Sequence, residues 1–322
     1  MASLLSVENL QVQFQTKKGI NTAVDGVSFS VEKGRILGIV GESGCGKSVT
    51  SMSILQLLGS NARISGGSIK LDGKELIGLP EKEMCRIRGN DIAMIFQDPM
   101  TALNPTLTIG TQLMEPIMLH QNCGKKEAWT RAVDVLKRVG IAEPEKRMKE
   151  YPHQLSGGMR QRVMIAMAVS CEPRLLIADE PTTALDVTIQ AQILELMCEL
   201  REKMGTAIML ITHDMGVVAE TADDVLVLYA GKAVEYGSIE DIFERPKHPY
   251  TQGLLNSIPR LDEDVELLNT IEGTVPAPDA MPAGCRFAPR CPYGKDRCMK
   301  EKPGVYHAGN SLVSCFRYEG EK

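Results

Sequence analysis

The sequence predicts an α/β fold with a mostly parallel sheet, an inserted helical segment and a small cysteine-rich module at the C-terminus. Three observations support this prediction. Short apolar runs alternate with helical patterns at the start of the chain and again after residue 175, and such alternation favours a parallel sheet. Between these parts, apolar residues from about 98 to 170 recur at helical spacing. Four of the nine cysteines fall within the last 38 residues.

The strands are predicted first, from apolar periodicity. Val12 and Phe14 alternate with polar neighbours, and the same alternation recurs over residues 27–31, as expected for half-buried strands. Continuous apolar runs predict buried strands over residues 35–40, 92–97, 175–179, 207–212 and 225–229.

Helical spacing predicts helices after residue 48, around residues 129–139 and around residues 189–200. The first of these includes Leu57 and Leu58. Prolines between residues 246 and 282 indicate a connector with some short structure. We therefore expect one domain over residues 1–250, whose helical subdomain covers about 98–170, and an extension over residues 251–322.

Composition excludes several function classes. The 322 residues carry a net charge of −5 and only 4% aromatic side chains, which argues against nucleic-acid binding. No apolar run approaches the roughly 18 residues of a membrane span. Glu8 lies where a signal peptide would be basic and then apolar, so no export signal is expected.

A phosphate-binding loop is predicted between the strand at 35–40 and the helix that follows. Residues 41–48, Gly-Glu-Ser-Gly-Cys-Gly-Lys-Ser, fit the pattern G-x-x-x-x-G-K-[ST]. Its glycines let backbone N–H groups face a phosphate, Lys47 can reach the β- and γ-phosphates, and the Ser48 hydroxyl can bind Mg²⁺. Cys45 is either a reactive thiol or, as we favour, a tolerated small residue. The residues expected to bind ATP here are Gly41, Ser43, Gly44, Cys45, Gly46, Lys47, Ser48 and Val49.

Two carboxylates end the predicted strand at 175–179. Asp179 would reach Mg²⁺ at the carboxyl edge of the sheet. Glu180 follows and is placed to polarise a water for attack on the γ-phosphate.

Residues 155–159, Leu-Ser-Gly-Gly-Met, resemble the LSGGQ signature of ABC ATPases, and only Met159 departs from it. Ser156, Gly157 and Gly158 would offer a hydroxyl and N–H groups to a γ-phosphate at a helix start. The resemblance covers about residues 1–250 and implies a P-loop NTPase (RecA-like) ABC ATPase core.

The same resemblance implies roles for further residues. Phe14 matches the aromatic residue that stacks on adenine. Gln97 matches the glutamine that contacts Mg²⁺ and the attacking water, which makes Ser48, Gln97 and Asp179 the implied Mg²⁺ ligands. Asp186 matches the D-loop, together with Ala184 and Leu185, and His213 matches the switch histidine.

The resemblance also implies partners. ABC ATPases bind nucleotide between the phosphate-binding loop of one cassette and the signature of another, and this chain has a single copy of each. We therefore expect a head-to-tail dimer with a second ABC ATPase, a homologous but different chain, whose ATP Ser156 and Gly158 would contact. Two transmembrane permease subunits and, indirectly, an extracytoplasmic peptide-binding protein would complete the system, at the cytoplasmic face of the cell membrane.

The C-terminal region resembles that of peptide importers. Residues 244–255 resemble the segment after the cassette in oligopeptide, dipeptide and nickel importers. The later cysteines, with spacing C-x5-C-x6-C-x16-C, lack the paired pattern of a zinc ribbon, and cytosolic thiols stay reduced. The resemblance implies a [4Fe–4S] cluster, while Zn²⁺ and no metal remain alternatives. The expected ligands are Cys285, Cys291, Cys298 and Cys315. The basic residues around them are interpreted as a solvated face that offsets thiolate charge.

The function indicated is that of an ATPase subunit of a di- or oligopeptide importer. A nickel or other small-solute importer is the alternative within the same class. A soluble ABC ATPase of translation or DNA repair is disfavoured because those usually carry two cassettes or very long insertions. A metal- or redox-sensing regulator with little turnover is disfavoured by the presence of Glu180 and His213.

Overall fold

A computed structural model describes residues 3–17, 19–182, 186–258, 270–277 and 280–320. The chain forms two compact units. The first contains Met1–Leu4, Glu32–Arg35 and Gly78–Ile211, and the second contains Leu5–Val31, Ile36–Ile77 and Thr212–Lys322. No described helix combines the length and the apolar character that crossing a bilayer demands.

The first unit has a parallel sheet at its centre. Strands β6 (Ile92–Ile95), β7 (Leu175–Asp179) and β8 (Ala207–Ile211) lie in the order β8-β7-β6. Every residue of β7 and β8 is buried, which explains their continuous apolar runs, because a parallel sheet is covered on both faces. Helix α8 (Val187–Met204) connects β7 to β8, so these predicted strands and their crossover helix are confirmed.

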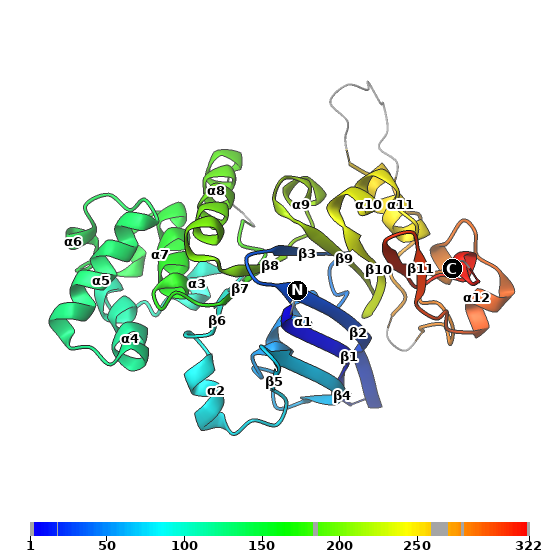
Figure 1. Ribbon diagram of the computed structural model, residues 1–322, viewed down its shortest axis with the longest axis horizontal. Coiled ribbons are helices and arrows are strands. Elements are labelled where there is room, and N and C mark those ends of the chain that lie inside the picture. The colour runs from blue at the N-terminus through cyan, green and yellow to red at the C-terminus, as the bar shows by residue number, and fades with distance from the viewer. Residues whose placement is uncertain (1–2, 18, 183–185, 259–269, 278–279, 321–322) are drawn as a thin grey trace. The chain divides into compact units, whose positions relative to one another are not determined.

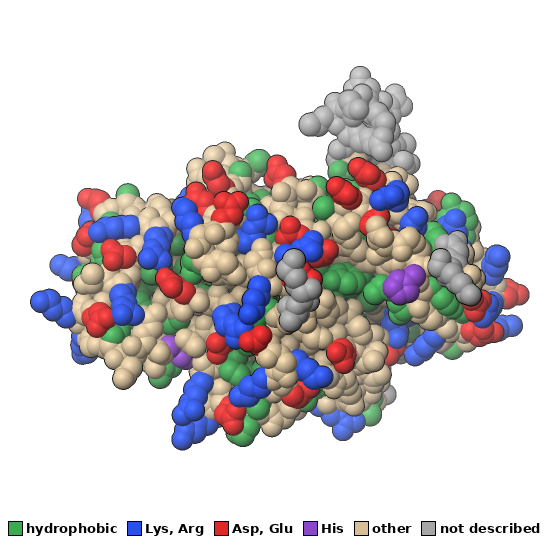
Figure 2. All heavy atoms as spheres, in the orientation of Figure 1, with side chains coloured by type: hydrophobic (Ala, Val, Ile, Leu, Met, Phe, Trp, Pro, Cys, Tyr) green, Lys and Arg blue, Asp and Glu red, His purple; other side chains and the backbone are tan. Residues whose placement is uncertain are grey.

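The helical part of this unit lies between β6 and β7 (Figure 1). Helix α5 (Lys125–Arg138) buries Ala132, Val133 and Leu136, as its spacing predicted, and also Ala128 and Val135. Figure 2 shows acidic and basic side chains interspersed over this part. Helix α2 precedes β6 and was not predicted. Helix α2 comprises Glu81–Ile87, and the helices between β6 and β7 are α3 (Pro99–Ala102), α4 (Ile109–Gln121), α5, α6 (Pro144–Arg147), the 3₁₀ helix η1 (Pro152–Gln154) and α7 (Gly157–Val169).

The second unit contains strands of two sheets (Figure 1). In one sheet the order is β2-β1-β4-β5, made of β2 (Gly19–Glu32), β1 (Ser3–Thr16), β4 (Ala62–Leu71) and β5 (Lys74–Glu75). In the other, the order is β11-β12-β10-β9-β3, made of β11 (Tyr306–Ala308), β12 (Ser311–Val313), β10 (Lys232–Ser238), β9 (Asp224–Tyr229) and β3 (Ile36–Val40). Strands β3 and β9 are parallel, and β10 returns antiparallel to β9.

Short helices complete the second unit. Helix α1 ends at Ile54, because Gln56 adopts a φ of 51° and leaves the helical conformation. Leu57 and Leu58 therefore lie outside it, contrary to the prediction. The helices are α1 (Lys47–Ile54), α9 (Met215–Thr221), α10 (Ile239–Glu244), α11 (Pro249–Asn256), η2 (Ala288–Arg290), α12 (Asp296–Lys300) and η3 (Phe316–Tyr318). Part of the predicted connector, at 259–269 and 278–279, lies outside the described residues.

The C-terminal residues are not a separate cysteine-rich module, which corrects that part of the predicted fold. Strand β12 pairs antiparallel with β10, with Glu235 opposite Val313 and Tyr236 opposite Leu312. Val313 is fully buried. The end of the chain thus extends a sheet of the second unit, where its apolar side chains join the core.

Candidate functional site

The phosphate-binding loop joins β3 to α1 in the second unit, and two of its glycines are sterically required. Gly41 adopts a φ of +151°, and a Cβ there would lie 2.1 Å from the carbonyl oxygen of Leu228. Gly46 adopts a φ of +101°, and a Cβ there would lie 3.0 Å from the carbonyl oxygen of Ala23. Only glycine combines this conformation with these close approaches.

Lys47 lies beneath the loop. Its side chain is buried, and Nζ donates to the carbonyl oxygens of Gly41 at 2.7 Å and Glu42 at 3.2 Å. Ser43, Gly44 and Ser48 are exposed, and Val49 is half-buried. The loop therefore exposes the turn at Ser43–Gly44 and the Ser48 hydroxyl, and the Lys47 ammonium is held close to its backbone. Phosphate binding requires such an arrangement.

Cys45 is buried within the loop, with 1% of its surface exposed. Burial raises the pKa of its thiol, and the neighbouring Lys47 only partly opposes this effect. The thiol is thus protonated and inaccessible, which favours the interpretation of Cys45 as a tolerated small residue over a reactive nucleophile.

In the first unit, the carboxyl ends of β6 and β7 bring two predicted catalytic residues together. The Gln97 side-chain amide donates to the Glu180 carboxylate at 2.9 Å. Glu180 has a φ of 47°, uncommon for a residue with a side chain, and its N–H donates to the Ile211 carbonyl at 2.9 Å. Asp179 is buried at the end of β7. Carboxylate and amide oxygens of this kind fit the oxygen preference of Mg²⁺.

The predicted signature residues lie at the start of α7. Ser156 is the N-cap, and its hydroxyl accepts from the Met159 N–H at 3.3 Å. Gly157 is exposed and has open space around it, while a Cβ at Gly158 would contact Ile189. The serine hydroxyl and the first turn of α7 are therefore available to an anion on the surface of this unit.

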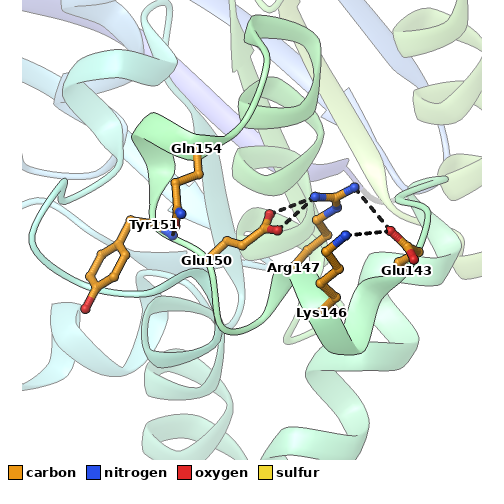
Figure 3. A network of polar contacts seen from close by, with 6 residues as sticks. All are labelled: Glu143, Lys146, Arg147, Glu150, Tyr151 and Gln154. Atoms are coloured by element: carbon orange, nitrogen blue, oxygen red, sulfur yellow. Dashed lines mark hydrogen bonds and ion pairs between the residues drawn. The ribbon is translucent and has the colours of Figure 1, made fainter.

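A polar network fixes the segment before Ser156 (Figure 3). Arg147 forms two hydrogen bonds to the Glu150 carboxylate, at 2.9 and 3.0 Å, and a third contact to Glu143. The Tyr151 N–H donates to the Gln154 side chain at 2.8 Å. These contacts lie just before α7, since η1 ends two residues before its N-cap Ser156.

The other predicted residues occupy loops and one strand. Asp186 is the N-cap of α8 and accepts from the Ile189 N–H at 2.9 Å. Ala184 and Leu185 of the predicted D-loop lie outside the described residues. His213 is exposed between β8 and α9, and Phe14 is half-buried on β1 opposite Ala62.

The metal prediction for the C-terminal cysteines is wrong. Cys285, Cys291, Cys298 and Cys315 are all described, yet the described part of the chain contains no group of three or more His, Cys, Asp or Glu residues that could hold a metal ion. Burial raises the pKa of Cys285 to about 11 and also raises that of Cys291 and Cys315. The structure thus supports neither a [4Fe–4S] cluster nor Zn²⁺.

Sequence reasoning missed the surroundings of Glu42, a variable position of the loop motif. Its carboxylate pairs with Arg290, and its N–H donates to the Tyr250 hydroxyl at 3.0 Å. These partners lie 248 and 208 residues away along the chain, so no local pattern could reveal them.

Two family models match the chain. Residues 24–183 match the ABC transporter model, and residues 234–298 match the model of the oligopeptide/dipeptide transporter C-terminal region.

Curated relatives match over nearly the whole length. The oligopeptide transport ATP-binding protein AppD of Bacillus subtilis is 56% identical over 100% of this chain and 98% of its own. The dipeptide transport ATP-binding protein DppD of the same organism is 54% identical over 98% of this chain and 95% of its own length. The oligopeptide transport ATP-binding protein OppD of Escherichia coli is 52% identical over 98% of this chain and 93% of its own length.

Solved structures share the fold. A dimeric post-hydrolysis state of the ATP-binding cassette MJ0796 bound to ADP and Pi is 27% identical, with a TM-score of 0.66 over 73% of this chain and 98% of that one. The cbiO1 protein of Clostridium perfringens, part of the ABC transporter complex cbiONQ, is 27% identical, with a TM-score of 0.64 over 76% and 92%.

Proposed function

Because the chain belongs to the ABC transporter family, among the ATP-binding proteins of oligopeptide and dipeptide transport, we propose that it hydrolyses ATP to drive import of di- and oligopeptides. The observation that carries this proposal is identity of 52–56% to such proteins over nearly the full length. The match includes residues 234–298, which belong to the C-terminal region typical of peptide transporters.

ATP binding is assigned to the second unit. Lys47 would exchange its bonds to the Gly41 and Glu42 carbonyls for the β- and γ-phosphates, while the exposed N–H groups of the loop bind phosphate oxygens. Phe14 would stack on adenine. The residues that would hold Mg²⁺ are Ser48, Gln97 and Asp179, which all offer oxygen atoms. Mg²⁺, when bound, neutralises charge on the phosphates.

Hydrolysis is assigned to Glu180 as the general base. Its carboxylate would orient the attacking water and accept a proton from it. Gln97, which donates to this carboxylate, would position both the carboxylate and the water. His213 would contact the γ-phosphate.

A second cassette would complete the reaction. Ser156, Gly157 and Gly158 would contact the ATP of a homologous partner chain, with Asp186 near that interface. Closing two cassettes around ATP and releasing them after hydrolysis would supply a two-state cycle. Two membrane permease subunits would use that cycle at the cytoplasmic face, and an extracytoplasmic binding protein would deliver the peptide to them.

Purification of the native complex through a tag on this chain tests the proposal. We expect a second ABC ATPase and two permease subunits to co-purify. ATP hydrolysis by the complex should rise with short peptides and not with Ni²⁺. Stimulation by Ni²⁺ alone would favour a nickel importer instead.

A further inference from the structure

Glu42 is held by three partner residues within the phosphate-binding loop. Its carboxylate accepts two bonds from Nη1 of Arg290, at 2.9 and 3.1 Å. Its N–H donates to the Tyr250 hydroxyl at 3.0 Å, and its carbonyl oxygen accepts from Lys47 at 3.2 Å. Two of these three partners, Tyr250 and Arg290, lie in the C-terminal region, after strand β10.

Arg290 is well placed to hold this loop. Its side chain is only 6% exposed. Besides Glu42, it donates to the carbonyl oxygens of Glu272 at 2.9 Å and Ile271 at 3.1 Å, and it contacts the Tyr229 hydroxyl at 3.4 Å. A planar guanidinium with all its nitrogen atoms engaged has a single orientation, so the position of the Glu42 carboxylate follows from it.

A second arginine supports the loop indirectly, near Cys45. Arg286 donates to the Ala230 carbonyl and pairs with Asp25 at 3.0 Å. Gly231, which follows Ala230 in the chain, donates its N–H to the carbonyl oxygen of Cys45 at 2.8 Å. The segment 286–290 therefore supports the phosphate-binding loop at two points, directly at Glu42 and, through residues 230–231, at Cys45.

An aromatic cluster holds this segment in place. Phe287 lies between the two arginines, and its ring centroid is 5.1 Å from that of Tyr229 and 5.4 Å from that of Tyr250. All three rings are buried. The first contact is edge-to-face and the second is tilted, and such ring contacts add to the stabilisation from burying large apolar surfaces, which anchors the segment 286–290.

We propose that Arg290 and Tyr250 are positioning residues for ATP binding, through which the C-terminal region holds the phosphate-binding loop in its receptive conformation. The inference rests on the proposed function, because it concerns the same ATP site. Without the ion pair to Arg290, Glu42 is no longer held in one position, and neither is its carbonyl oxygen, which accepts from Lys47. ATP must then order the loop when it binds, and this ordering lowers the affinity.

ATP affinity of the full chain tests this inference. We would titrate ATP without Mg²⁺, so that no hydrolysis occurs, and record the heat of binding. Arg290→Gln is expected to weaken ATP binding by about tenfold, and Tyr250→Phe, which removes one hydroxyl and keeps the ring, by about threefold. Arg297→Gln is the matched control, because Arg297 also pairs with carboxylates in the C-terminal region but is exposed, and its partners are Glu301, Glu319 and the Phe316 ring instead of the phosphate-binding loop.

A double-mutant cycle separates positioning from general destabilisation. Glu42→Gln should weaken binding about as much as Arg290→Gln, and the double variant should be no weaker than either. Losses that multiply to about a hundredfold, or an Arg290→Gln chain that binds like the wild type, would overturn the inference. If Arg290→Gln does not fold, Glu42→Gln removes the same ion pair. ATP binding by Glu42→Gln that equals that of the wild type would then overturn the inference. Wild-type chain that binds no ATP would instead overturn the proposed function.

Discussion

The Gln97 side-chain amide donates a hydrogen bond to the Glu180 carboxylate, with 2.9 Å between Nε2 and Oε2. The two residues follow neighbouring parallel strands, β6 and β7, whose carboxyl ends meet at one edge of the sheet. Glu180 adopts a φ of 47° there, and strained backbone of this kind clusters at functional sites. The proposed hydrolytic step gives a role to both residues of this pair.

Replacing Glu180 by Gln should separate binding from hydrolysis. The variant keeps the size of the side chain but cannot accept a proton, so the ATPase rate should fall by about 100-fold or more, with ATP affinity retained. Steady-state phosphate release and ATP titration measure the two effects. Glu199→Gln, at an exposed site on α8, is the control and should leave both unchanged. A Glu180→Gln chain with normal turnover would show that another residue is the base.

Gly41→Ala should weaken ATP binding strongly. Its Cβ would lie 2.1 Å from the Leu228 carbonyl oxygen at a φ of +151°, so the loop must move or strain. We expect ATP affinity to fall by more than about tenfold. The control is Gly124→Ala at the start of α5, where φ is −78° and nothing approaches the added methyl group. Equal affinity of the two variants would contradict this account of the loop.

Ser156→Asn distinguishes two roles of the signature serine. Asparagine caps helices as well as serine does, so α7 should remain stable. Its longer side chain does not replace the hydroxyl, however, and hydrolysis by the assembled complex should fall at least about tenfold if Ser156 contacts the partner's ATP. Ser238→Asn, at the N-cap of α10, should not affect hydrolysis. Unchanged ATPase activity with Ser156→Asn would show that Ser156 caps α7 but does not contact the partner's ATP.

His248 should make stability depend on pH. It is buried, which lowers its pKa to about 3, and its Nδ1 accepts from the Tyr250 N–H at 3.1 Å. The unfolded chain takes up a proton near pH 6.5 and the folded chain does not. The contribution of His248 to the free energy of unfolding is therefore complete above pH 6.5 and decreases as the pH falls from 6.5 toward 3.

Urea denaturation at pH 7 and pH 5 measures this effect. Relative to His248→Asn, which can still cap α11 but does not titrate, the wild type should lose about 2 kcal/mol between these pH values. Taking the difference between the two proteins removes the contribution of carboxylates such as Glu235, whose pKa burial raises. Parallel pH profiles would show that His248 is accessible to protons in the folded chain.

The parts of the fold with strong local signals were predictable. The buried strands β3, β6, β7, β8 and β9 are continuous apolar runs, and α5 has clear helical spacing. Strands β11 and β12 have three residues each and are defined by pairing with β10, a long-range contact that no short window encodes. The cassette fold was therefore predictable, whereas the incorporation of the C-terminus into a sheet was not.

The same reasoning explains the errors at the C-terminus. Four cysteines close in sequence suggested a metal site, but in the described part of the chain they do not form a group that could hold a metal ion. Arg286 and Arg290 were counted as part of a solvated basic face. Both are instead largely buried, and they pair with Asp25 and Glu42, which lie more than 240 residues away. Composition gives the charge of such residues but not their partners.

Peptide uptake into proteoliposomes tests the central claim most directly. The complete importer, reconstituted with ATP on the side of this chain and supplied with its binding protein, should accumulate a radiolabelled tripeptide. Accumulation should stop when Glu180→Gln replaces the wild-type chain and continue with Glu199→Gln. Uptake that persists with Glu180→Gln, or uptake of Ni²⁺ but of no peptide, would contradict the claim that this chain powers peptide import through hydrolysis at Glu180.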